Sequence, residues 1–99
     1  MTAKRRTTLV EARRVGDLID VDWKTCDIKQ FRRGIDVEYE HGARDPQTDV
    51  THDDPILTGR IALAHLKEFA DYYTRLDQME AEARRARAAR WRRSVKKKG

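Results

Sequence analysis

The feature that most constrains the fold is the long helical pattern that follows Asp54-Pro55. This pair is a favoured helix start, since the carboxylate caps free backbone N–H groups and proline suits the first helical position. Apolar residues then recur at spacings of three and four, which predicts one buried face. They are Leu63, Leu66, Phe69, Ala70, Tyr73 and Leu76. No proline or glycine lies between Gly59 and Gly99, so the pattern predicts one continuous helix, apolar in its first half and basic in its second.

A short first helix is expected near the N-terminus. Thr8 and Glu11 have the spacing of a capping box, in which each side chain satisfies a backbone N–H of the other residue. This spacing predicts a helix from residue 9 to about residue 15, closed by Gly16. Residues 18–23 add apolar side chains among aspartates and are expected to form an irregular segment.

A second helix is expected over residues 28–33. Thr25 or Asp27 can cap it, and Gly34 is placed to be the first residue after its end.

Two structures remain open for the residues that follow. Alternation of apolar and acidic residues over 35–39 is typical of a short half-buried strand. The alternative is a helix that continues through Gly34 to His41, with three apolar residues stacked at spacing four. Residues 42–54 are rich in turn formers and are expected to form the longest loop, a kind of segment that is often functional.

Charge is segregated along the chain. Residues 1–14 have five basic and one acidic side chain, a net charge of +4, and residues 82–99 have nine and one, a net charge of +8. Residues 15–81 have eight basic and fifteen acidic side chains, a net charge of −7. The helical patterns predict a mainly α fold class. The charges divide the chain into a basic arm (1–7), a helical domain (8–80) and a basic helical tail (81–99). Such basic ends are typical of proteins that bind polyanions.

Size and composition limit the other possibilities. A chain of 99 residues is one domain at most, and a core this small is marginal alone, which favours a homo-oligomer or docking on a partner. The single cysteine, Cys26, excludes an intramolecular disulfide and fits a reducing setting. No apolar run reaches the roughly 18 residues that a membrane span needs, and no apolar segment of a signal peptide follows the basic N-terminus. We expect a soluble protein without membrane contact.

Two pairs of residues have the spacing of metal ligands. Glu38 with His41, and His65 with Glu68, are each three residues apart, as in di-iron helical bundles. If their segments were antiparallel helices joined by residues 42–54, His41 would face about residue 55, too far from His65 to share an ion. We therefore expect surface ion pairs, no metal or other cofactor, and no enzymatic activity. The alternative is a metal-dependent enzyme that uses these four residues.

Other candidates for chemistry are weaker. The carboxylates from Asp49 to Asp54 lack the spacing of a calcium-binding loop, so we expect Asp53 and Asp54 to cap the following helix. Cys26 has no neighbouring histidine in the sequence to activate it. The pair at residues 72–73 is interpreted as a core ring beside a surface ring.

The basic tail is the strongest functional signal. Its arginines point in most directions around a helix, so this helix cannot pack against an apolar core, and phosphate contacts from it are expected to be independent of sequence. A tryptophan among them can stack on a base or dock into a partner. The alternative is a solvated charge run that keeps the protein soluble. The predicted nucleic-acid-binding residues are Arg84, Arg85, Arg87, Arg90, Trp91, Arg92, Arg93, Lys96, Lys97 and Lys98.

Several motifs over residues 17–80 also resemble a known family. They are Phe31-Arg-Arg-Gly34-Ile-Asp-Val-Glu38, Glu38-Tyr-Glu-His-Gly42, Thr51-His-Asp-Asp-Pro55, the run from Thr58 to Leu76, and Leu76-Asp-Gln-Met-Glu80. The chain resembles a family of small proteins, many encoded by bacteriophages, that is classed as a domain of unknown function. Relatives commonly carry a proline just before the Asp-Tyr-Tyr of residues 71–73, where this chain has Ala70. The resemblance does not extend to the two basic ends.

The phage association implies a role in the virion or in takeover of the host cell. We expect a non-enzymatic, virion-associated head or connector component whose basic ends contact nucleic acid, located in the virion or the host cytoplasm. Its partners would be nucleic acid and other phage or host proteins. A further alternative is a regulator that binds a host protein through the acidic body.

Overall fold

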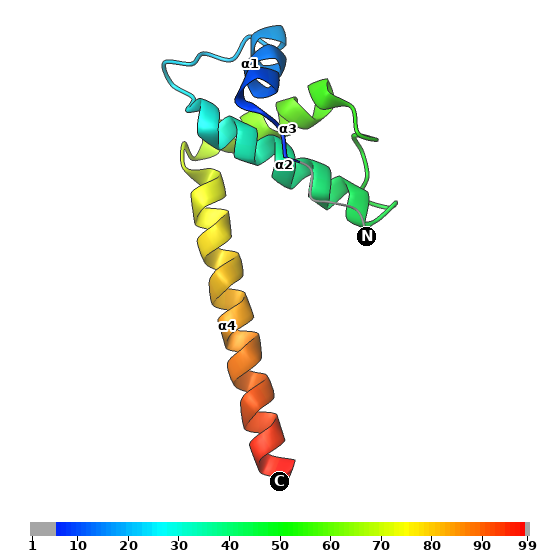
Figure 1. Cartoon of the computed structure of the whole chain (residues 1–99), viewed down its shortest axis with the longest axis vertical. Helices are drawn as coiled ribbons and strands as arrows, with labels where there is room; N and C mark the ends of the chain where they lie inside the picture. Colours follow the sequence, from blue (N-terminus) through cyan, green and yellow to red (C-terminus); the bar gives the residue numbers. More distant parts are fainter. Residues whose placement is uncertain (1–5, 99) are drawn as a thin grey trace.

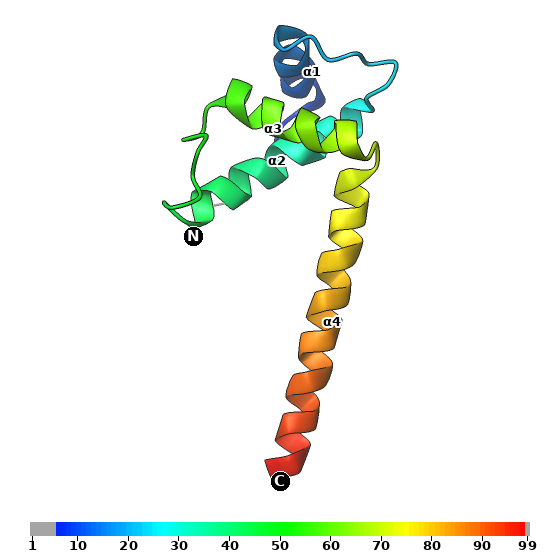
Figure 2. The same ribbon diagram turned by 180° about the vertical axis from the view of Figure 1, so that it is seen from behind.

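Three helices form a body from which the fourth helix projects. The computed structural model describes residues 6–98, in which α1 (Leu9–Leu18), α2 (Ile28–Arg44), α3 (Pro55–Glu68) and α4 (Tyr72–Lys98) follow one another. Figure 1 shows α1, α2 and α3 packed together and α4 leaving them as a single rod, and the view from behind in Figure 2 shows the same arrangement. The mainly helical fold and the long C-terminal helix are confirmed. The resulting shape measures 58 × 28 × 22 Å.

Side-chain caps begin the first three helices where the sequence predicts them. The Thr8 hydroxyl accepts a hydrogen bond from the Glu11 backbone N–H at 3.1 Å. Asp27, one of the two predicted caps, accepts from the backbone N–H groups of Lys29 and Gln30. Asp54 accepts from two N–H groups of α3, with proline at the first helical position. Each cap satisfies donors that have no partner inside the helix.

The prediction that two glycines end helices is wrong. Helix α1 continues past Gly16 to Leu18, and α2 continues through Gly34 to Arg44, so residues 35–39 are helical and not a strand. A glycine that follows a helix end usually has a positive φ. No glycine among residues 6–98 has one. Both glycines are buried, and their missing side chains let aromatic rings approach the helix backbone. A Cβ atom at either position would overlap a ring, that of Trp23 at Gly16 and that of Tyr73 at Gly34.

The prediction of one continuous helix from residue 55 is also wrong. Helix α3 ends at Glu68, and Phe69 is extended, with φ −141° and ψ 120°. Helix α4 begins at Tyr72, so the break spans residues 69–71 and includes the first residue of the Asp-Tyr-Tyr segment. Phe69 and Ala70, both predicted to be core, are exposed; the Phe69 ring instead lies under the Arg75 guanidinium at 5.9 Å.

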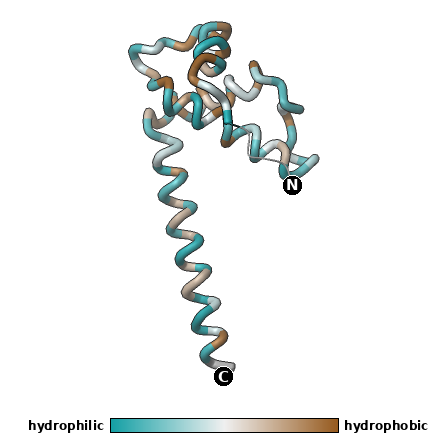
Figure 3. The backbone as a smooth tube through the Cα atoms, viewed as in Figure 1, coloured by the Kyte–Doolittle hydropathy of each residue, from teal (hydrophilic) through white to brown (hydrophobic). Residues whose placement is uncertain are grey.

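The core lies where the body helices meet the first turn of α4. Phe31 and Ile35 of α2, Ala62 of α3 and Tyr73 of α4 are each no more than 1% exposed. Among the predicted core residues, Leu66 and Tyr73 are buried, and Leu63 and Leu76 pack against the cluster at partial burial. Hydrophobic segments gather in the body in Figure 3, whereas hydrophilic segments dominate α4. None of the helices over residues 6–98 is long and apolar enough to span a membrane.

Candidate nucleic-acid interface

Tyr73 anchors the base of α4 in the body. Its ring is completely buried and lies against Gly34, where any side chain on α2 would exclude it. Its hydroxyl donates a hydrogen bond of 2.7 Å to the Glu38 carboxylate, which is also buried. Burial raises the pKa of the Tyr73 hydroxyl, and the hydrogen bond to Glu38 raises it further, so the hydroxyl remains a donor. This contact joins α4 to the middle of α2.

His65 of α3 completes a hydrogen-bonded network. Its Nδ1 lies 3.1 Å from the Glu38 carboxylate and 3.1 Å from the Tyr73 hydroxyl. A proton on Nδ1 satisfies both contacts, since the carboxylate accepts it and the hydroxyl oxygen has a free lone pair. The Tyr72 ring stacks on the imidazole at a centroid distance of 4.4 Å and an angle of 5°. One buried carboxylate therefore links α2, α3 and α4, and this network sets the direction in which α4 leaves the body.

This geometry corrects the predicted register of the histidines. Glu38 contacts His65, and its other oxygen lies 3.9 Å from Nδ1 of His41. His65 therefore lies beside Glu38. If α2 and α3 were aligned antiparallel with residue 41 facing residue 55, as expected, residue 65 would instead face about residue 31. The difference of seven residues is about 10 Å along a helix, which the loop over 45–54 allows. Glu68, the fourth candidate, is exposed. Across residues 6–98, no three His, Cys, Asp or Glu side chains are grouped so that they could hold a metal ion.

Polar contacts surround the buried anchor. The Gln30 amide donates a hydrogen bond of 2.7 Å to the Thr74 hydroxyl, and the Arg33 guanidinium lies 2.8 Å from the Asp77 carboxylate. The hydrogen bond that the guanidinium donates to Asp77 raises the pKa of Arg33. Both members of this ion pair are nearly half exposed, so it stabilises the joint by at most about 1 kcal/mol.

Beyond Asp77, α4 is a solvent-exposed cationic helix. No side chain between Gln78 and Lys96 is buried, and Trp91 and Val95, one turn apart, are 68% and 48% exposed. In the described part of the chain, none of the seven cationic side chains from 84 to 96 forms an ion pair. All seven are exposed: Arg84, Arg85, Arg87, Arg90, Arg92, Arg93 and Lys96. The predicted side chains of Lys97 and Lys98 lie outside the described residues.

The cations project on all sides of the helix. At 100° per residue, positions nine residues apart lie on opposite sides, so Arg84 is opposite Arg93 and Arg87 is opposite Lys96. The 15 residues from 84 to 98 extend about 22 Å at 1.5 Å per residue. A single α-helix fits the major groove of B-DNA, which is about 12 Å wide and has a row of phosphates along each edge. Cations on opposite sides of α4 can reach both rows.

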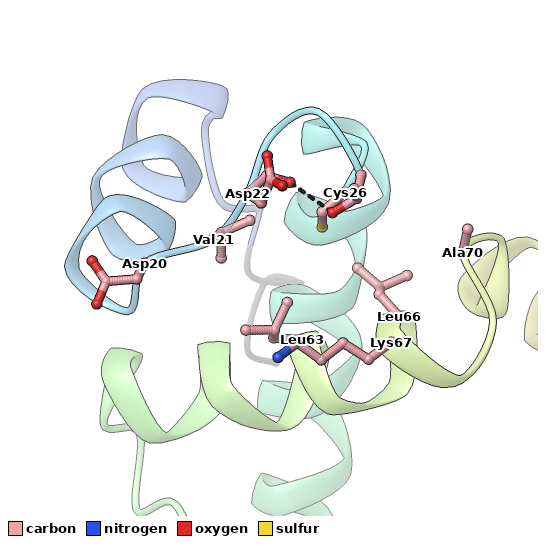
Figure 4. Close-up of a pocket in the computed structure, with 9 residues that line it drawn as sticks. Asp20, Val21, Asp22, Cys26, Leu63, Leu66, Lys67 and Ala70 are labelled. Carbon is pink, nitrogen blue, oxygen red and sulfur yellow. Dashed lines mark hydrogen bonds between the residues drawn. The ribbon is translucent and has the colours of Figure 1, made fainter.

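Cys26 lies apart from this helix, at the pocket shown in Figure 4. The pocket has a volume of about 390 Å³ and lies between the α1–α2 connection and α3, where Leu63, Leu66 and Lys67 line it. Burial, and then the charge of Asp27, raises the pKa of the Cys26 thiol, which disfavours the reactive thiolate. No histidine is among the residues that line the pocket.

The acidic loop before α3 uses its carboxylates to hold its own backbone. Asp45 accepts from the Gln47 N–H and Asp49 from the His52 N–H, and Asp54 caps α3 as predicted. His52 and Asp53 have positive φ values of 47° and 64°, as a tight turn requires. This loop supports the start of α3.

These features define a class of protein: a small helical body whose buried polar anchor directs a long basic helix into solvent. The chain belongs to the family described as a protein of unknown function (DUF5661), whose match covers residues 12–82. The match includes the whole anchor and ends before the first arginine of the cationic half of α4. Comparisons with curated proteins and with solved structures give no match.

Proposed function

We propose that this protein is a non-enzymatic nucleic-acid-binding protein and that the distal half of α4 is its binding element. The observation that carries the proposal is the set of seven exposed cations from Arg84 to Lys96, without carboxylate partners, on a helix that the body holds clear of its own acidic surface. A helix with this distribution of charge binds phosphates without reading bases.

Electrostatics supply the driving force for binding. Arginines three residues apart, such as Arg84 with Arg87 and Arg87 with Arg90, repel each other in the free protein. A phosphate backbone removes this repulsion, and counterions leave the nucleic acid. If about four to six phosphates are neutralised, log K falls with log salt with a slope of about −4 to −5 on duplex DNA.

Binding can be measured by fluorescence anisotropy on two unrelated duplexes of equal length, over a series of salt concentrations. We expect equal affinities for the two sequences. The variant Arg84→Gln/Arg87→Gln/Arg90→Gln/Arg93→Gln should make the slope of log K against log salt less negative by about 3–4. Each lost phosphate contact changes this slope by about 0.9. Glutamine has nearly the helix propensity of arginine, so the fold should persist.

Arg75→Gln is the matched control. Arg75 lies on the same helix, but it already pairs with Asp71 at 2.8 Å, so its loss should leave DNA affinity within about twofold. A quadruple variant that binds DNA as tightly and as salt-dependently as the wild type would refute the proposal.

We propose further that the setting is a bacteriophage particle, where the protein lies between the protein shell and the packaged DNA. The resemblance of residues 17–80 to proteins common in phages supports this setting, as does the contrast between an acidic body and a basic helix. Mass spectrometry of purified particles should detect the protein in a fixed ratio to the capsid protein. Its presence in infected cells but not in particles would instead favour the regulator that binds a host protein.

A further inference from the structure

We infer that the body carries a second phosphate-binding site, a basic pocket formed by Arg6, Lys29 and Arg32. The inference rests on the proposed function, because the phosphate it assigns to this pocket belongs to the nucleic acid that α4 binds. The pocket has a volume of about 400 Å³ and lies where the segment before α1 crosses the first turns of α2. Thr7, Thr8 and Leu9 complete its lining.

The chain before α1 is fixed at this place. Thr7 is only 6% exposed, and its backbone N–H donates a hydrogen bond of 2.8 Å to the Asp36 carboxylate of α2. Thr8 then caps α1. Arg6 therefore follows on from an anchored backbone, and it lines the same pocket as Lys29 and Arg32.

The charges that line the pocket are all positive. Three other pockets of 310–390 Å³ each contain an aspartate beside their cations, whereas no carboxylate lines this one. Arg32 has one acidic neighbour, Asp36, at 3.9 Å, and Asp36 also accepts the Thr7 N–H. Arg6 and Lys29 are exposed and form no ion pair within the described part of the chain. Three cations around a space without an anion of the protein suit a ligand with two or more negatively charged oxygens.

The pocket is next to the base of α4. Lys29 and Arg33 are one turn apart on α2, and Arg33 extends to Asp77 on the first turns of α4. The pocket and the base of α4 thus lie beside each other along α2. A nucleic acid bound along α4 can place a phosphate in the pocket, which would fix its position relative to the body.

Salt-dependent binding of duplex DNA by the full-length protein tests this inference. The variant Lys29→Gln/Arg32→Gln should lower the steepness of the salt dependence by about 1, the value for one phosphate contact, and weaken binding several-fold. Lys24→Gln is the matched control, because Lys24 is an exposed lysine of the same body and does not line this pocket. A second measurement uses inorganic phosphate as the probe: amide NMR signals of residues 7–10 and 29 should shift in the wild type and not in the double variant.

The outcomes separate this inference from the proposed function. If the double variant behaves like Lys24→Gln on DNA, the inference fails, whatever the α4 variants do. If phosphate shifts the signals but the DNA salt dependence is unchanged, the pocket binds free anions and the assignment to nucleic acid is overturned. If the α4 quadruple variant keeps full affinity while the double variant loses it, the proposed function fails and the pocket stands. A circular-dichroism spectrum like that of the wild type shows that the variant is folded.

Discussion

The substitution Gly34→Ala tests the central packing contact of the structure, the one between α2 and the base of α4. A Cβ atom at residue 34 would overlap the edge of the Tyr73 ring, and it would lie 2.9 Å from Cζ of that ring and 3.0 Å from Cβ of Ala62. The ring cannot easily move away, because it is fully buried and its hydroxyl is hydrogen-bonded to Glu38.

Opposing terms decide the size of the effect. Alanine in a helix interior is favoured over glycine by about 1 kcal/mol. Overpacking of a buried site costs about 1–3 kcal/mol, and displacement of the Tyr73 hydroxyl from Glu38 costs a further 0.5–1.5 kcal/mol or so. We therefore expect Gly34→Ala to lower the free energy of unfolding by about 0.5–3.5 kcal/mol, against the direction that helix propensity alone predicts.

Urea unfolding of the body can be followed by the fluorescence of Trp23 in a Trp91→Phe background. Trp23 reports on the body, since its ring packs edge-on against Phe31 at 5.7 Å.

Gly42→Ala is the control within the same helix. Its Cβ would meet the side-chain tips of Asp49 at 3.2 Å and Thr51 at 3.5 Å, which can shift. Its effect should lie between no change and a gain of about 1 kcal/mol. If Gly34→Ala were as stable as Gly42→Ala or more so, Tyr73 would not occupy the position that the structure gives it.

Three further predictions concern the anchor, the thiol and the tail. Tyr73→Phe should destabilise the protein by about 1–3 kcal/mol, since it removes the shorter of the two hydrogen bonds to the buried Glu38 carboxylate and leaves His65 as the remaining partner. Because the raised pKa of Tyr73 keeps its proton in the folded state, wild-type stability should fall as pH rises above about 10, where an unfolded tyrosine ionises; the variant should lack this contribution in urea unfolding at high pH. Cys26, whose pKa burial raises, should react with iodoacetamide at pH 8.5 more slowly in the folded protein than in urea, and equal rates would contradict its burial. In hydrogen exchange of the free protein, amides of residues 63–68 and 72–76 should be protected and those of 84–95 should not, unless DNA is added; strong protection of 84–95 in the free monomer would indicate an assembly interface.

Local sequence rules predict the starts of the first three helices but neither the start of α4 nor the helix ends. A cap at Thr8, Asp27 or Asp54 depends on atoms within three residues of itself, so a sequence pattern is sufficient to find it. A glycine is ambiguous, because it suits either a left-handed residue after a helix or a close approach of another side chain. At Gly16 and Gly34 the deciding partners are Trp23 and Tyr73. Tyr73 is distant in the sequence, and neither contact follows from a local pattern.

The break between α3 and α4 has the same origin. No proline or glycine interrupts residues 63–76, so a continuous helix is locally possible. The extended conformation of Phe69 instead turns the chain so that Tyr73 enters the space at Gly34, and burial of an aromatic ring outweighs the small preference for helix at residues 69–71. Phe69 is exposed as a consequence.

The sequence was sufficient to predict the cationic residues of α4, but not the hydrogen-bonded network of Tyr73, Glu38 and His65 at its base. The cations of the tail need no tertiary information, because their pattern leaves no apolar face to bury. The contact of His65 with Glu38 depends on the register between α2 and α3, which the sequence of the loop between them does not define. The pocket of Arg6, Lys29 and Arg32 combines side chains from two segments, and the nearest sequence signal was the basic character of the first 14 residues.

The anchor and the cationic helix depend on each other through helix nucleation. The first turn of an isolated helix is unfavourable because several residues are fixed for one hydrogen bond, whereas each later residue adds about one bond. In α4 the contacts of Tyr73, Thr74 and Asp77 with α2 fix that first turn. The distal half then only has to propagate from an existing turn, against the repulsion of its arginines. If nucleic acid binds as proposed, we therefore expect neutralisation of a few of these charges by phosphates to complete the helix, while the contacts at its base direct it away from the acidic body, which would otherwise compete for the same cations.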